Sequence, residues 1–200
     1  FSFPSPITEI DKNILSDCSS LTKVTIPSSV TLIDDNAFYD CSKLVEITMP
    51  SSLLSIGNWS FFNCSSLKEI TIPSSVKYIG ESAFSKCALL KQITIPSSIT
   101  KIGKYAFSGC TSLVKISIPT SVVDLENGIF SGCLSLDDFV FHPSIKKIGG
   151  LAFRGCTSLK NVAIPPSITE IGEKPFFKCT SITELTIPSS LKIMAPHKTF

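Results

Sequence analysis

Residues 83–103 read AFSKCALLKQITIPSSITKIG, and the same pattern returns along the whole chain. The cysteine in this stretch is one of eight, which stand at positions 18, 41, 64, 87, 110, 133, 156 and 179. Every interval between them is therefore 23 residues. A constant period of this size is typical of a solenoid, in which one small unit stacks on copies of itself. The sequence predicts a single elongated domain over residues 1–200, built from about eight 23-residue repeats.

The repeated unit is C-x-S-L-x-x-I-T-I-P-S-S-V-x-x-I-G-x-x-A-F-x-x when the copies are aligned. The alternation in L-x-x-I-x-I predicts a strand with one buried face, and the following Pro ends it because it lacks an N–H group. Strands of successive coils would lie side by side and form one parallel sheet of about eight strands in a right-handed coil. The segment V-x-x-I-G predicts a short second strand or extended edge, with a positive φ at its Gly, and A-F-x-x-C predicts a single 3₁₀ or helical turn.

The motif L-x-x-I-x-I fits the leucine-rich repeat pattern, and the longer unit with I-P-S-S-V-x-x-I-G-x-x-A-F-x-x-C resembles the BspA-like class of leucine-rich repeats. The resemblance covers essentially the whole chain. It implies a curved solenoid with the parallel sheet on its concave side. It also implies adhesion to host or matrix proteins, or other protein–protein contacts, by a protein that is secreted or lies on the cell surface.

The eight cysteines fall in one column of the repeat, next to the Phe column. Neighbours in such a column are about 4.8 Å apart with parallel Cα–Cβ bonds, whereas a disulfide needs converging Cβ atoms at about 3.8 Å. We therefore expect buried free thiols, which favour an intracellular protein as the alternative location. No CxxC pair, phosphate-binding Gly loop or regular His position occurs, so the sequence predicts no metal, no cofactor and no enzymatic activity.

The charge pattern limits the class of partner. The net charge is +2 and no run of Lys or Arg exceeds two residues, which argues against a nucleic acid partner. No apolar run approaches the ~20 residues that a membrane span requires. The chain begins and ends inside a repeat, so we interpret it as a segment of a longer protein or as a processed form.

The outward positions of the predicted sheet carry the candidate protein-binding site on the concave face. They form a continuous surface of mixed charge, which suits a protein partner. The candidate residues are Lys23, Glu46, Lys68, Glu69, Lys91, Gln92, Lys115, Asp137, Asp138, Val140, Asn161 and Glu184. The function predicted from this surface is that of a non-catalytic scaffold that binds a protein. The resemblance to BspA-like repeats implies, more specifically, a surface adhesin.

A second candidate contact is an aromatic cluster of Tyr39, Trp59 and Phe62 on the turns of adjacent coils. Exposed apolar patches often mark contacts, but aromatic side chains also cover the edge of a coil. This cluster and the ends of the solenoid favour the alternative function, a structural spacer or self-assembly module that stacks through either of them.

The least regular copy spans residues 119–148, where Phe139 and Phe141 replace Ile and His142 replaces Pro. Larger side chains in a core shift the backbone, so one expectation is a locally repacked coil. The other is a bend or contact site that contains Asp137, Asp138, Val140 and His142. The Ser column that includes Ser52 and Ser75 is expected to bond backbone groups at the corners.

Overall fold

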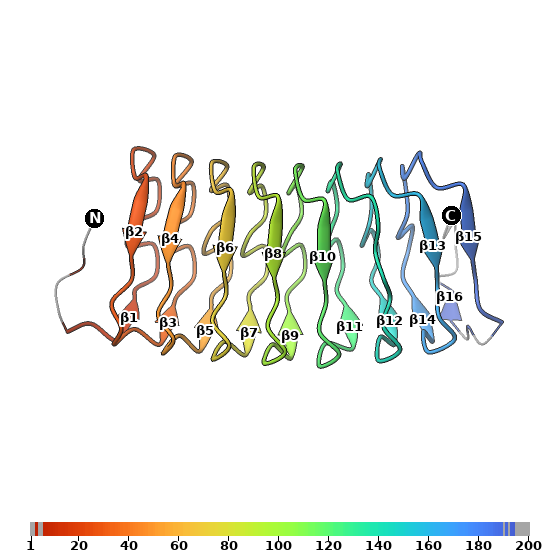
Figure 1. The fold of residues 1–200 in the computed structure, drawn as a ribbon, viewed down its shortest axis with the longest axis horizontal. Helices are drawn as coiled ribbons and strands as arrows, with labels where there is room; N and C mark the ends of the chain where they lie inside the picture. The colour runs from red at the N-terminus through yellow and green to blue at the C-terminus, as the bar shows by residue number, and fades with distance from the viewer. Residues whose placement is uncertain (1–2, 4–5, 190, 192, 195–200) are drawn as a thin grey trace.

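The computed structural model describes residues 3, 6–189, 191 and 193–194. The chain forms an elongated solenoid whose coils follow one another from the N-terminal to the C-terminal end (Figure 1). Two rows of short strands run along its length, and none of the residues just given is in a helix. Over the same residues, no helix is long and apolar enough to cross a membrane.

The first row consists of strands with three residues each, in which only the central side chain points into the core. Its outer surface is called the sheet face below. The strands are β2 (Lys23–Thr25), β4 (Glu46–Thr48), β6 (Glu69–Thr71), β8 (Gln92–Thr94), β10 (Lys115–Ser117), β13 (Asn161–Ala163) and β15 (Glu184–Thr186). Paired strands are parallel, and each residue faces the residue 23 positions away, such as Ile70 opposite Ile93.

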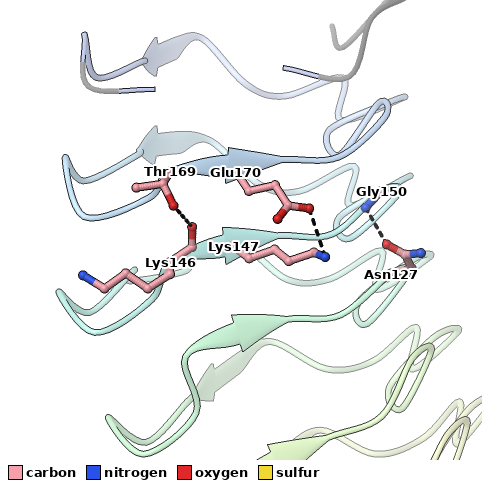
Figure 2. Close-up of polar contacts among 6 residues, drawn as sticks. All are labelled: Asn127, Lys146, Lys147, Gly150, Thr169 and Glu170. Atoms are coloured by element: carbon pink, nitrogen blue, oxygen red, sulfur yellow. Dashed lines mark hydrogen bonds and ion pairs between the residues drawn. The ribbon is translucent and has the colours of Figure 1, made fainter. Parts of the chain in front are cut away.

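The second row consists of strands with two residues each, which confirms the predicted short second strand. They are β1 (Glu9–Ile10), β3 (Leu32–Ile33), β5 (Ser55–Ile56), β7 (Tyr78–Ile79), β9 (Lys101–Ile102), β11 (Asp124–Leu125), β12 (Lys147–Ile148), β14 (Glu170–Ile171) and β16 (Ile193–Met194). Side chains also join adjacent coils here. Figure 2 shows the ion pair of 3.0 Å between Lys147 Nζ and Glu170 Oε1 and the bond from Thr169 Oγ1 to the Lys146 carbonyl.

The class of fold is as predicted, but the first row is not one continuous sheet. It is divided into β2–β4, β6–β8–β10 and β13–β15, and residues 137–142 of the irregular coil contain no strand. The cause of the second break is the pair Phe139 and Phe141. Both rings are buried, and they meet edge to face at 4.8 Å between centroids, so this coil needs more width than the Ile residues of its neighbours. The expectation of a repacked coil is confirmed.

A ladder of phenylalanine rings forms the centre of the core. Phe38, Phe61, Phe84 and Phe107 are fully buried and stack with centroids 5.1 to 5.8 Å apart and nearly parallel planes. The 23-residue period places the same ring at the same height in every coil, so each ring contacts the ring before and after it. The ladder tilts only at Phe130, where the ring of Phe139 enters beside it.

The glycine of the V-x-x-I-G segment has a different role from the one predicted. Gly80 does not have a positive φ; a Cβ at this position would lie 2.5 Å from Asn58 N and Gly57 O in the preceding coil. The column is therefore glycine because two backbones approach too closely for a side chain. Positive φ values occur instead in the turn, at residues such as Trp59 and Tyr105 (50° and 56°). Their N–H groups bond carbonyls of the next coil, with Trp59 N to Glu81 O at 2.8 Å.

The corner serines act largely as predicted. Ser52 Oγ donates to the carbonyl of Val30 at 2.6 Å, and Ser98 Oγ donates to that of Val76 at 2.7 Å. Equivalent bonds are made by Ser29, Ser75 and Ser121. In contrast, Ser167 Oγ is buried without a partner, and Ser190 lies outside the described residues. Each bond joins the corner of one coil to the preceding coil, so the serines hold neighbouring coils together.

Candidate protein-binding surface

The sheet face presents the predicted binding residues to solvent. Eleven of the twelve are exposed, and only Asp137 is half-buried. The alternating pattern explains this result, because a buried central residue in each strand turns both of its neighbours outward. The face also pairs opposite charges across coils: Lys23 Nζ and Glu46 Oε1 are 2.7 Å apart.

A hollow of about 630 Å³ lies on the sheet face between β4 and β6, at the first break in the row. The predicted residues Glu46, Lys68 and Glu69 line it. The apolar part of its floor comes from Val45, Met49 and Pro73, because the side chains of the central residues Ile47 and Ile70 point into the core. The arrangement provides a shallow apolar floor with charged groups of both signs at its margin.

A second hollow of about 320 Å³ lies beside the irregular coil, across β8 and β10. Gln92, Lys115, Asp138 and Val140 line it, so the structure brings together four residues that the sequence placed on three different coils. Val140 is 75% exposed, more than any other large apolar side chain in the described part of the chain. An apolar side chain with this exposure is available for contact with a partner.

The remaining predicted residues do not line these hollows. Lys91 is exposed at the start of the β8 coil, and Asn161 faces Glu184 across β13 and β15, beyond the irregular coil. Conversely, the prediction missed Met49, Ser51 and Pro73, which line the hollow between β4 and β6. They belong to the strand-end and corner columns, and Met49 is more accessible than the buried Ile26 and Ile72 of its column. The two strands at this hollow share no ladder of hydrogen bonds. The repeat pattern around β4 and β6 did not predict this break in the row.

The polar residues of the irregular coil are partly enclosed. One carboxylate oxygen of Asp137 is buried without a hydrogen-bond partner. His142 Nδ1 accepts a bond from Ser144 N at 3.2 Å, and burial lowers the pKa of this imidazole. His142 is therefore held against its own corner. Only Asp138 and Val140 of this coil lie at the hollow.

The predicted aromatic cluster is mostly packed against itself. Tyr39 and Phe62 are half-buried and stack at 5.0 Å between ring centroids, and Lys86 Nζ lies 4.9 Å above the Phe62 ring. Trp59 is the exposed member, at 36%. Two of the three rings therefore cover the edge of their coils, which is the structural alternative that the sequence left open.

The cysteines form a buried column of free thiols, as predicted. Six of the eight are buried, and Cys18 and Cys179 are half-buried. Each sulfur from Cys41 onward donates to a main-chain carbonyl of the preceding coil, such as Cys110 Sγ to Phe84 O at 3.2 Å. Burial raises the pKa of the Cys41 and Cys110 thiols to about 12. No group of three or more metal-binding side chains occurs in the described part of the chain.

Native-state thiol labelling is expected to modify two cysteines per chain rapidly, Cys18 and Cys179, and all eight after denaturation. The reactive species is the thiolate, which a buried thiol with a raised pKa does not form near pH 8. Mass spectrometry of the alkylated chain measures this count. The double variant C18S/C179S should leave no fast-reacting thiol; rapid modification of Cys87 or Cys110 in the native state would contradict the buried column.

One protein-family model matches this chain, and it identifies the class of protein. The model of the BspA type leucine rich repeat region, in six copies, matches residues 1–100 and 79–198. The chain belongs to this family of leucine-rich repeat scaffolds. No curated protein sequence matches the chain.

Several solved structures are similar to this chain. A leucine-rich repeat protein from Bacteroides ovatus is 33% identical with a TM-score of 0.78, and the match covers 95% of this chain and 58% of that one. The chain thus spans little more than half the length of this relative. A leucine rich repeat protein of T. pallidum is 34% identical with a TM-score of 0.74, over 79% of this chain and 76% of the other. The pneumococcal vaccine antigen PcpA shares the fold at 20% identity and a TM-score of 0.51, over 94% and 72% of the two chains.

Proposed function

We propose that this chain is a non-catalytic scaffold that binds a protein partner through the sheet face. The observation that carries the proposal is the pair of hollows, at β4–β6 and at β8–β10, on the same face. Each combines accessible apolar side chains, such as Met49 and Val140, with charged residues of both signs. Protein-binding surfaces likewise combine apolar contacts with a polar rim. The two hollows are separated by the single coil step between β6 and β8, so one partner can fill both.

The partner is expected to carry charges of both signs. Around the hollows Lys68 and Lys115 alternate with Glu46, Glu69 and Asp138. Complementary charges of this kind mainly set specificity and the rate of association, while the apolar contacts at the floor contribute more of the affinity. A polyanion such as a nucleic acid would meet repulsion at three of these five positions.

The test compares two triple variants with the same change in charge. K68E/K91E/D138K alters the sheet face, and K77E/K101E/D124K alters exposed residues on the second row. Each is used as bait with wild type, and the retained proteins are identified by mass spectrometry. We expect a partner that wild type and the second-row variant retain and the sheet-face variant loses. Equal retention by both variants, with unchanged circular dichroism, would show that the sheet face is not the site.

A location on the cell surface or in a secreted form fits this function, and we propose it for this chain. The free cysteines weigh little against it, because six of them are buried and hydrogen-bonded and therefore poorly accessible to oxidants. Protease accessibility on intact cells tests the location; protection of the chain until the cells are lysed would favour the intracellular alternative.

Self-association is the second candidate function, and it depends on Trp59 because Tyr39 and Phe62 stack on each other. Sedimentation velocity over a wide concentration range, with W59S as the comparison, tests it. A concentration-dependent dimer that W59S abolishes would support assembly through this cluster, whereas a monomer at every concentration would exclude it.

A further inference from the structure

A hollow of about 480 Å³ lies away from the sheet face, on the turns that follow the second row of strands. It extends over four consecutive coils, from Tyr105 at one end to Phe177 at the other. It contains none of the twelve predicted sheet-face residues and no member of the aromatic cluster. Its volume is within the range of small-ligand sites, about 300 to 1,000 Å³.

Glycines lie in and beside this hollow. Gly128 occupies the turn position that holds Tyr105 in the coil before, and the Tyr105 ring occupies the space that a Cβ at Gly128 would need. Gly150 and Gly172 continue the floor toward Phe177. The aromatic rings at the two ends remain accessible, with Tyr105 38% and Phe177 43% exposed. The result is a trough with a flat aromatic wall at each end.

Positive charge is concentrated at the Phe177 end. Arg154 lines the hollow and is exposed, and no carboxylate of the described residues lies within ion-pair distance of it. Lys174 Nζ and Lys178 Nζ lie 5.9 and 5.5 Å from the centre of the Phe177 ring. Glu173 is the one carboxylate in the lining, and it pairs with Lys174 at 3.4 Å. Three cations and one anion give a local charge of +2, equal to that of the entire chain.

Neutral hydrogen-bond donors occupy the middle of the hollow. Asn127 Oδ1 accepts the N–H of Gly150 at 2.8 Å, which fixes the orientation of the carboxamide (Figure 2). Its NH₂ group is consequently free to donate to a ligand. The Tyr105 hydroxyl is a further donor in the lining. A ligand that fits must therefore offer acceptors along its length and an anionic group near Arg154.

We propose that this hollow binds an oligosaccharide that carries carboxylates, of the uronic acid type. The guanidinium of Arg154 matches a carboxylate with two parallel hydrogen bonds, the sugar hydroxyls take bonds from Asn127 and Tyr105, and the C–H faces of the sugar rings pack against the exposed aromatic walls. An acidic peptide would satisfy the cations but offers no flat apolar face to both walls. The proposal concerns a different surface from the sheet face and does not depend on protein binding there.

The test measures binding of trigalacturonate to the purified chain by NMR or calorimetry. The probe's fully methyl-esterified form, which keeps the shape and removes the charge, is the matched ligand control. We expect saturable binding of the acid and at least tenfold weaker binding of the ester. Tetraglutamate is the third probe, and it should also bind at least tenfold more weakly than the acid.

Variants locate the site. R154A should weaken binding of trigalacturonate at least tenfold, and F177A should weaken it severalfold. The control is K86A, which also removes an exposed cation beside an aromatic ring, that of Phe62, but lies outside the hollow; it should leave binding unchanged. Thermal melts check that each variant is folded.

Three results would overturn the proposal: no saturable binding of trigalacturonate, equal binding of acid and ester, or equal loss in R154A and K86A. Tetraglutamate binding as tightly as the sugar would replace the proposal with an acidic peptide site. None of these outcomes affects the sheet-face proposal, because the variants K68E/K91E/D138K alter no residue of this hollow.

Discussion

Phe84→Ala is expected to lower the free energy of unfolding by about 4 kcal/mol, the usual range for removing a buried aromatic ring. Phe84 is fully buried and stacks between Phe61 and Phe107, at 5.4 and 5.8 Å between centroids. The coils on both sides are fixed by their own hydrogen bonds, so they cannot collapse into the space and a cavity remains. Urea unfolding followed by circular dichroism measures the loss.

The matched control is Phe177→Ala, because this ring is 43% exposed and lies outside the ladder. It should cost well under half as much. The double variant F84A/F107A should depart from additivity, since these rings are in contact, whereas F38A/F153A should be additive. Equal losses in F84A and F177A would contradict the ladder as the centre of the core.

Gly80→Ala is expected to lose about 3 kcal/mol or more, which is the upper range for inserting atoms into a packed interior. The new Cβ would lie 2.5 Å from backbone atoms of the preceding coil, and a backbone cannot rotate away as a side chain can. Relief requires the coils to separate locally, which lengthens the hydrogen bonds on both sides. Urea unfolding again measures the loss.

Gly155→Ala provides the comparison, because it adds the same methyl group at a position where no neighbouring atom is too close. The nearest atom to its Cβ would be Gly132 Cα at 3.9 Å, so only its φ of 71° opposes the change. That strain costs about 1 kcal/mol for a residue with a side chain. A loss in G155A equal to that in G80A would mean that backbone conformation, rather than the approach of the coils, determines where glycine is needed.

The strand rows and the core were predictable from the sequence because they follow from local alternation repeated at a fixed period. Ile70 and Ile93 must face the same way when the chain between them closes one coil, and the residues on either side of each must face outward. The exposure of Lys68, Glu69 and Gln92 follows from the same rule. So does the inaccessible column of cysteines, since identical positions in every coil point in the same direction.

The glycine columns show where this reasoning was insufficient. From the sequence, Gly80 and Gly155 are both glycines at a turn, and only the first has a glycine in the copies on both sides. The structure separates their roles. Gly80 is needed because the backbone of the preceding coil lies too close for a side chain. Gly155 has a positive φ, but Lys86 and Asn63 adopt a positive φ at the same position in other coils, so this position does not require glycine. Distances between coils, which decide the first role, are not a property of any local segment.

The sequence by itself determined the period, the inward columns and the outward positions, because these depend on backbone geometry within one coil. Tertiary structure alone decided the division of the first row between β4 and β6, which predicted residues share a hollow, and that Tyr105 and Arg154 line a common surface. The reason is that a hollow is a difference between neighbouring coils. The three hollows lie beside the irregular coil that contains Phe139 and Phe141, between the unpaired strands β4 and β6, and along the turns at Gly150 and Gly172.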